Sequence, residues 1–342
     1  MTVESDTSLP RFPPRRFLAA LAAASFGCAL AACSASAQWG ESGTAYVSDS
    51  TSFAITPIHL DTNRASRPIP AGSSPTGLAA SADGTTLYVA NYSGGLAIVR
   101  PTRPVNPPPM VDTASGSIRV AIDRSTKTAW VVDSVAGTLT PVNLVTDKTG
   151  PPIGAGDHPT SVAIDAGSSL AYVTDFGSAR LSRLDLGTGK ITGTIGVGFQ
   201  PVDVILGRGS RTAYVADYGD DAVSVVSLSG RTRRRVVKVG TEPSSLALSS
   251  TGRYLYVANY ASGSLSVVDT RTRTVVHTIA VGREPAGVAV SSDGRFAYVT
   301  DYGGNSVSVV DLSSFSIDSR IKVGRGPSGI VIVRNTREDG VL

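Results

Sequence analysis

Four polar residues of this chain are spaced so that they could act together in one site. His158, Gln200, Glu242 and Glu284 each directly precede a proline, and each lies 42 residues from the next. The two glutamates could serve as a general base or as ligands for calcium or magnesium, because hard divalent cations prefer carboxylate oxygens. His158 could then act as an acid or a further ligand, with Arg119 holding an anionic group. This set predicts a hydrolase or lyase assisted by a divalent cation.

The same positions have a simpler interpretation, since surface connections are polar because they meet water. No single loop contains a His-x-His motif, a pair of carboxylates or a nucleophile motif. The remaining histidines, His59 and His277, fall elsewhere in the pattern, so a His-rich metal centre is not expected. Catalytic roles for His158, Glu242 and Glu284 are therefore the second hypothesis. No cofactor is predicted, and calcium or magnesium are the candidate ions.

Binding is the first hypothesis, and its candidates stand close to the same prolines. Asp203 occupies the second position after its repeat proline, and Arg119 occupies the equivalent position in the copy where Ser117 replaces the proline. A second group of aromatic residues recurs in an adjoining loop, where it either packs against the next loop or contacts a sugar or a protein partner. The residues predicted to bind are Arg119, Gln200, Asp203, Tyr218, Tyr260 and Tyr302.

An Asp or Asn directly precedes each of these loop positions. A ring of such side chains resembles a metal or catalytic site, but a short Asx side chain usually hydrogen-bonds the backbone of its own turn. We therefore expect them to cap turns. The residues are Asp49, Asn91, Asp133, Asp175, Asp217, Asn259 and Asp301.

The elements that position these residues follow from a repeat of constant length. An aromatic residue returns every 42 residues without an insertion, at Tyr46, Tyr88, Trp130, Tyr172, Tyr214, Tyr256 and Tyr298. One copy, residues 283–324, contains four short runs rich in β-branched residues, separated by Gly, Asp and Asn. Four strands in about 42 residues is the length of a β-propeller blade.

The two ends of the repeat array complete one another. The first copy lacks its first strand, and the last copy, residues 327–333, contains only that strand. Together they predict an all-β, seven-bladed propeller with four antiparallel strands per blade, whose ring is closed by a blade shared between the N- and C-terminal segments. Strands one and three of a blade run in the same direction. The crossover before strand one and the loop after strand two are therefore expected on one face, at the mouth of the axial channel.

The repeat resembles the YVTN family of β-propeller repeats, which are relatives of the NHL type. The resemblance rests on the segments Tyr172-Val173-Thr174-Asp175 and Tyr298-Val299-Thr300-Asp301, each after a Pro-x-x-Val-Ala strand. It implies a propeller fold and leaves the activity open, because such propellers host many functions. Lactonase and lyase propellers of this kind use the channel mouth.

The N-terminal segment is typical of an export signal. Basic residues precede an apolar stretch, residues 17–30, which is too short for a permanent membrane span. It ends in Leu30-Ala31-Ala32-Cys33, which resembles the lipobox of bacterial lipoproteins, so Cys33 is the predicted lipidation site. Ordinary cleavage after Ala37, which would release a secreted protein, is the alternative. Either the general secretory or the twin-arginine route could carry the chain.

Domain boundaries follow from these features: a lipoprotein-type signal peptide at 1–32, a tether at 33–42, the propeller at 43–333 and a tail at 334–342. No cysteine lies beyond Cys33, which excludes an internal disulfide or a thiolate site in the propeller. Beyond residue 32 the net charge is about +3 (28 basic minus 25 acidic), too mild to predict nucleic-acid binding. One dense basic run, residues 231–238, is interpreted as a charged edge strand or as a contact with an anionic membrane.

The sequence therefore predicts an exported, lipid-anchored, monomeric β-propeller of the cell envelope. We expect it to act as a non-catalytic binding or scaffold module for an envelope protein or a small ligand at the channel-mouth face. The alternative is a lactonase-like hydrolase or lyase. No residue supports a redox function.

Overall fold

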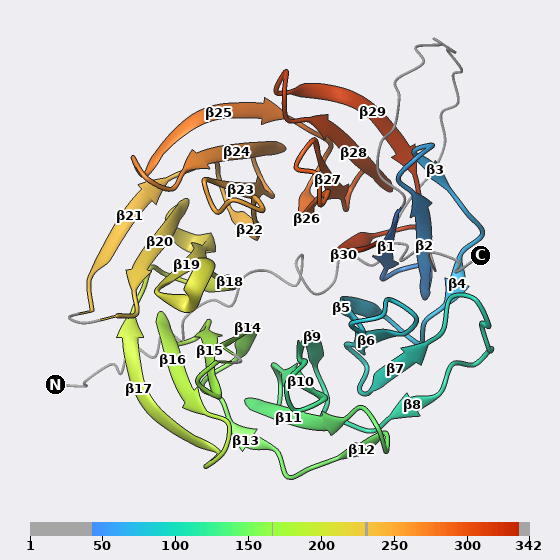
Figure 1. Ribbon diagram of the computed structural model, residues 1–342, viewed down its shortest axis with the longest axis vertical. Coiled ribbons are helices and arrows are strands. Elements are labelled where there is room, and N and C mark those ends of the chain that lie inside the picture. The colour runs from blue at the N-terminus through green and yellow to red at the C-terminus, as the bar shows by residue number, and fades with distance from the viewer. Residues whose placement is uncertain (1–42, 166, 230–231, 335–342) are drawn as a thin grey trace, which may run out of the picture. The chain divides into compact units, whose positions relative to one another are not determined.

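The computed structural model describes residues 43–165, 167–229 and 232–334, and these form seven small antiparallel sheets around a central axis. Figure 1 looks along this axis, with the innermost strand of each sheet near the centre and the outermost at the rim. The predicted seven-bladed β-propeller is confirmed.

The blades are numbered here along the chain, and each is given from its inner to its outer strand. Blade 1 contains β30 (Pro327–Arg334), β1 (Gly43–Asp49), β2 (Ala54–His59), β3 (Arg64–Ala65) and β4 (Ile69–Pro70). Blade 2 contains β5 (Pro75–Ala80), β6 (Leu87–Asn91), β7 (Leu96–Val99) and β8 (Met110–Val111). Blade 3 contains β9 (Ser117–Asp123), β10 (Thr128–Asp133), β11 (Thr138–Asn143), β12 (Lys148–Thr149) and β13 (Ile153–Gly154).

The other four blades are more regular. Blade 4 contains β14 (Pro159–Asp165), β15 (Leu170–Asp175), β16 (Arg180–Asp185) and β17 (Lys190–Gly196). Blade 5 contains β18 (Pro201–Leu206), β19 (Thr212–Asp217), β20 (Ala222–Ser227) and β21 (Arg234–Lys238), with short 3-10 turns η1 (Arg208–Ser210) and η2 (Tyr218–Asp220). Blade 6 contains β22 (Pro243–Leu248), β23 (Tyr254–Asn259), β24 (Ser264–Asp269) and β25 (Thr274–Ala280). Blade 7 contains β26 (Pro285–Val290), β27 (Phe296–Asp301), β28 (Ser306–Asp311) and β29 (Ser316–Lys322).

The ring closes in blade 1, where the last strand of the chain pairs with the first. β30 lies antiparallel to β1, with Arg334 opposite Gly43 and Val331 opposite Tyr46. Figure 1 shows this pair, blue beside red. This pairing with β30 covers the backbone groups of β1, which would otherwise form the inner edge of blade 1.

The apolar core lies between neighbouring blades. β27 is buried along its whole length, whereas the outer strand β29 is mostly exposed. One core cluster joins Tyr256 and Val267 of blade 6 to Val288 and Val299 of blade 7. Each blade is therefore packed by both neighbours, which explains why a repeat of fixed length is required.

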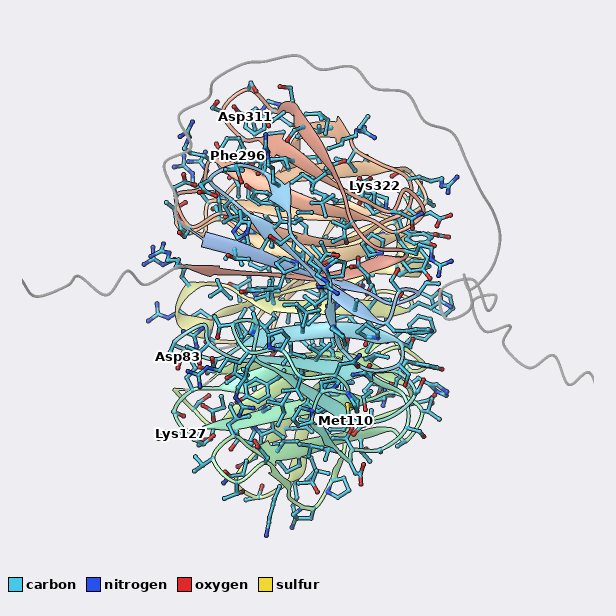
Figure 2. The ribbon with its side chains drawn as sticks, turned by 90° about the vertical axis from the view of Figure 1, so that its right-hand side faces the viewer. Asp83, Met110, Lys127, Phe296, Asp311 and Lys322 are labelled. Atoms are coloured by element: carbon cyan, nitrogen blue, oxygen red, sulfur yellow. The ribbon has the colours of Figure 1, made fainter. Side chains whose placement is uncertain are left out.

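The ring has two unlike faces. One, the crossover face, carries the links between blades and the loops between the second and third strands. The other, the hairpin face, carries the turns between strands one and two and between strands three and four. Figure 2 views the ring edge-on: Asp83 and Lys127, in hairpin-face turns, lie on one side, and Lys322 lies on the other.

The predicted signal peptide, Cys33, the tether at 33–42 and the tail beyond Arg334 lie outside the described residues. Within the described ranges, no helix has the length and apolar character needed to cross a membrane.

Candidate functional site

The residue before the repeat proline, or before Ser117 in blade 3, adopts a left-handed backbone in every blade. Its φ angle is 53° at His158, 53° at Gln200, 57° at Glu242 and 56° at Glu284. Ser74, Gly116 and Gly326 hold the same position with φ angles of 71°, 82° and 65°. Glycine adopts this conformation freely, whereas other residues do so at a cost of about 1 kcal/mol. Blades 4 to 7 thus retain long polar side chains at strained positions, a pattern found at functional sites.

A backbone hydrogen bond joins this crossover residue to the aromatic loop of its own blade. Tyr260 N donates to Glu242 O at 2.8 Å, and Tyr302 N donates to Glu284 O at 3.0 Å. The same bond links Tyr218 to Gln200 at 3.1 Å. The prediction that crossovers and loops share one face is therefore confirmed.

Side chains connect each of these pairs to the next blade. Tyr218 Oη donates to Glu242 Oε2 at 2.6 Å, from blade 5 to the crossover of blade 6. The Tyr260 hydroxyl makes the corresponding bond to Glu284 in blade 7. The ring of Tyr302 lies against Gly326 of the next crossover, where an added Cβ would be 3.3 Å from Tyr302 Cε2. A continuous set of half-buried residues results, here called the Tyr–Glu arc: Gln200, Tyr218, Glu242, Tyr260, Glu284 and Tyr302.

The electrostatics of the arc keep its phenols protonated. Burial, followed by the bond to Glu242, raises the pKa of Tyr218 well above its ordinary value. Burial and Glu284 raise the pKa of Tyr260 in the same way. Both glutamates act on both phenols, so the two carboxylates lie close to both tyrosines. The arc offers carboxylate acceptors and aromatic rings, which together suit a ligand with protonated amines.

His158 is paired with an aspartate of its own crossover. It is exposed, and its Nδ1 lies 2.6 Å from Asp157 Oδ1 in the same crossover. Within the described part of the chain, no three His, Cys, Asp or Glu residues gather closely enough to hold a metal ion. The fit of a divalent cation to His158, Glu242 and Glu284 therefore has no geometric support, and their catalytic roles stay a prediction.

Arg119 and Asp203 lie in the axial channel and contact one another. Arg119 Nη2 is 3.4 Å from Asp203 Oδ1, although 84 residues and one intervening blade separate them. The Asp203 carboxylate also accepts hydrogen bonds from Ser161 Oγ at 2.8 Å and from Leu246 N at 2.9 Å. One buried carboxylate thus connects the inner strands of blades 3 to 6. A cavity of about 200 Å³ surrounds the pair.

The Asp/Asn ring does not cap its own turns, and that prediction is wrong. Asp217 accepts Ser224 Oγ from the third strand at 2.5 Å and Gly198 N from the crossover at 2.9 Å. Asp301 accepts Ser308 Oγ at 2.8 Å and Gly282 N at 2.9 Å. The side chains are buried and connect the second strand to the third strand and to the crossover.

These buried carboxylates explain the crossover glycines. A Cβ at Gly282 would lie 2.0 Å from Asp301 Cγ, and one at Gly198 would lie 2.4 Å from Asp217 Cγ. Burial also raises the pKa of Asp49 to about 7 and that of Asp217 to about 6. The ring therefore belongs to the scaffold.

The sequence analysis did not predict two features of the site: the left-handed backbone of the crossover residues and the hydrogen bonds between blades. The spacing of the residues does contain a signal for the hydrogen bonds. Tyr218 precedes Glu242 by 24 residues, and Tyr260 precedes Glu284 by the same interval. Two residue types that recur together at a fixed offset indicate contact between neighbouring copies.

Comparison with known proteins supports the fold. The sequence profile of the YNCE-like beta-propeller family matches residues 16–337 of this chain. No curated protein sequence matches it.

Solved structures of low sequence identity are also similar. A functionally unknown protein from Desulfotomaculum acetoxidans is 15% identical, with a TM-score of 0.75 over 86% of this chain and 99% of that one. Hydrazine synthase from Kuenenia stuttgartiensis is 17% identical, with a TM-score of 0.72 over 79% of this chain and 92% of that one. The periplasmic gluconolactonase PpgL of Pseudomonas aeruginosa is 18% identical, with a TM-score of 0.71 over 85% of this chain and 99% of that one. At these identities the likeness establishes the fold alone.

Proposed function

This chain belongs to the YNCE-like beta-propeller family, and we propose that it is an exported, non-catalytic binding module whose site is the Tyr–Glu arc. The single observation that carries this proposal is the hydrogen bond of 2.6 Å between Tyr218 and Glu242, repeated between Tyr260 and Glu284 one blade further on. These bonds fix two carboxylates in defined positions on an accessible face. Preorganised groups of this kind favour binding because little conformational entropy is lost.

The ligand class follows from the chemistry of the arc. Two carboxylates and three tyrosines lie together, and both glutamates raise the pKa of the phenols beside them. A ligand with protonated amines would gain ion pairs from Glu242 and Glu284 and cation–π contacts from the rings. We therefore propose a polyamine or another small molecule with several amines as the ligand.

The cell envelope is the proposed location. The lipobox-like sequence ending at Cys33 supports export and a lipid anchor. The similar structure of a periplasmic gluconolactonase is consistent with an extracytoplasmic propeller. The YVTN-type repeat motif, for which residues 172–175 are an example, also belongs to this proposal.

Binding of spermidine, measured by isothermal titration calorimetry, tests the proposed function. We expect binding by the unaltered protein that weakens with added salt, and a loss of about tenfold or more for Glu242→Gln combined with Glu284→Gln. The matched control is Tyr92→Phe. Tyr92 holds the loop position of blade 2, where the following crossover has Gly116 in place of a glutamate. Absence of spermidine binding, or an equal loss in the control, would refute the proposal.

A lactonase-like enzyme is the second candidate function, because a gluconolactonase shares the fold and because glutamates occupy the channel mouth. Hydrolysis of glucono-δ-lactone, followed by acid release in the presence of calcium or magnesium, tests it. Activity that disappears in the Glu242→Gln, Glu284→Gln variant would favour the enzyme over the binding module.

A further inference from the structure

The hairpin face of blades 5 to 7 is rich in arginine. Seven arginines lie in or beside its turns, all exposed: Arg208, Arg211, Arg233, Arg253, Arg271, Arg273 and Arg295. The acidic residues of the same turns are Asp269, Asp293 and Asp311. Blades 5 and 6 carry six of these arginines and one of the aspartates, whereas blade 7 carries one arginine and two aspartates. Positive charge therefore exceeds negative charge on this part of the face as a whole, here called the arginine sector.

The acidic residues are already engaged. Asp269 Oδ2 lies 2.6 Å from Arg253 Nη2, and its Oδ1 accepts Arg271 N at 2.8 Å. Asp311 accepts Ser313 N at 2.7 Å, and Asp293 accepts Arg295 N at 2.9 Å. In contrast, five of the arginines have no carboxylate within ion-pair distance among the residues that the structure describes: Arg208, Arg211, Arg233, Arg271 and Arg273.

An arginine of blade 5 lies close to the arginine-bearing turn of blade 6. A Cβ at Gly252 of blade 6 would lie 3.3 Å from the Cγ and Cδ atoms of Arg208 in blade 5, so the Arg208 stem lies against the turn that carries Arg253. The Arg253 guanidinium lies 5.5 Å from the ring centroid of Tyr254, and that of Arg295 lies 5.4 Å from Phe296. The Arg208 stem thus brings the arginines of blades 5 and 6 together.

The rest of the hairpin face differs. In blades 1 to 4 its basic residues, such as Arg124 and Lys127, alternate with Asp61, Asp83, Asp123, Asp147, Asp165 and Asp185. Both signs are therefore interspersed there, as on an ordinary soluble surface.

The chain enters and leaves the propeller on this face. Gly43 opens β1 and Arg334 closes β30, and the two are paired at the hairpin end of blade 1. Gly43 lies ten positions after Cys33 (43 − 33), a span of at most about 35 Å when the chain is extended. An acyl group on Cys33 would therefore keep Gly43, at the hairpin end of blade 1, within about 35 Å of a bilayer.

We propose that the arginine sector of blades 5 to 7 binds the surface of a membrane that contains anionic phospholipid. Guanidinium groups bind phosphate oxygens with two parallel hydrogen bonds, and several such contacts orient the protein with the crossover face away from the lipid. The proposed orientation depends on the proposed anchor at Cys33, whereas binding of the arginines to anionic lipid does not.

Flotation with vesicles tests this proposal. The exported chain carries Cys33→Ser, so no acyl group contributes, and it is mixed with vesicles of phosphatidylcholine alone or with phosphatidylglycerol added. We expect binding only with phosphatidylglycerol, and a loss of about tenfold or more for Arg208→Gln, Arg211→Gln, Arg271→Gln and Arg273→Gln together. The control variant removes the same number of charges from the hairpin face of blades 2 and 3 and is expected to bind almost as well. It carries Arg100→Gln, Arg103→Gln, Arg124→Gln and Lys127→Gln.

Equal losses in the two variants, or equal binding to both kinds of vesicle, would overturn the proposal. Preferential binding of a single-stranded oligonucleotide in competition with the vesicles would also overturn it, in favour of a nucleic-acid surface. Spermidine binding by both variants is also measured, because it tests the Tyr–Glu arc on the crossover face, away from the substituted arginines. Its retention shows that the fold and the Tyr–Glu arc are intact, so failure here remains separate from failure of the proposed function.

Discussion

Tyr218 and Glu242 are joined by a hydrogen bond of 2.6 Å from the phenol to the carboxylate, across the boundary between blades 5 and 6. Glu242 is held at a left-handed φ of 57°, and its carbonyl accepts the amide of Tyr260. The backbone and side chain of one glutamate therefore link two successive aromatic loops. This arrangement makes the arc a site with fixed geometry.

Replacing Tyr218 by Phe should weaken spermidine binding about tenfold, because Glu242 loses the donor that positions its carboxylate. The stability loss should be about 1 kcal/mol, as expected for one hydrogen bond. Calorimetry and urea unfolding measure the two quantities. Tyr92→Phe, which has no glutamate partner in the next crossover, should leave binding unchanged. A Tyr218→Phe protein with full affinity would contradict this role.

Comparison of Glu242→Gly with Glu242→Ala should distinguish the cost of the left-handed backbone from the role of the carboxylate in binding. Both changes remove the carboxylate and should weaken binding equally. Glu242→Gly should be more stable than Glu242→Ala by about 1 kcal/mol, because glycine accepts a φ of 57° without strain. Urea unfolding of the two variants gives the difference. Equal stabilities would show that the crossover relaxes when the side chain is removed.

Stability should fall as the pH rises from about 4 to about 7. Burial raises the pKa of Asp49 to about 7 and of Asp217 to about 6, from 3.8 in the unfolded chain. The folded state therefore binds more protons than the unfolded state in this window, and unfolding becomes easier as these protons leave. The stabilising contribution is complete below pH 4 and is lost above pH 7.

Asp49→Asn with Asp217→Asn should reduce this pH dependence and raise stability at pH 8. Asn91 and Asn259 already occupy the same position in blades 2 and 6 and are fully buried. Asn259 Nδ2 donates to Ser266 Oγ at 3.0 Å, the bond that an asparagine at 217 would make to Ser224. Urea midpoints at pH 5 and pH 8 give the comparison. An unchanged slope in the double variant would disprove the assignment.

Asp203→Ala should destabilise the propeller by roughly 3 kcal/mol, because it leaves Arg119, Ser161 Oγ and Leu246 N without their acceptor. Arg119→Met should cost much less, since Asp203 keeps its other donors. Thermal unfolding of both variants measures the asymmetry. If the two losses were equal, the ion pair itself, rather than the Asp203 network, would hold the inner strands together.

Mass spectrometry of the mature N-terminus tests the anchor. We expect a chain that begins at an acylated Cys33, since the preceding residues resemble a lipobox. An unmodified chain that begins at Gln38 would show ordinary cleavage after Ala37 and would remove the tether from the membrane proposal.

The sequence alone determined the architecture. A constant interval of 42 residues between Tyr46 and its later equivalents requires equivalent blades, since each packs against two neighbours. The missing first strand before Tyr46 and the extra strand at 327–333 predicted the closure that Val331 and Tyr46 make. Strand direction also placed His158, Gln200, Glu242 and Glu284 on one face.

Only the tertiary structure decided what these residues contact. Asp217 turns inward to Ser224 and Gly198, Arg119 crosses to Asp203 over 84 residues, and Tyr218 reaches the glutamate of the next blade. Periodicity fixes the position of a side chain within its blade. Its partner depends on the side-chain direction, the backbone conformation and the packing of neighbouring sheets, which come from the closed ring as a whole.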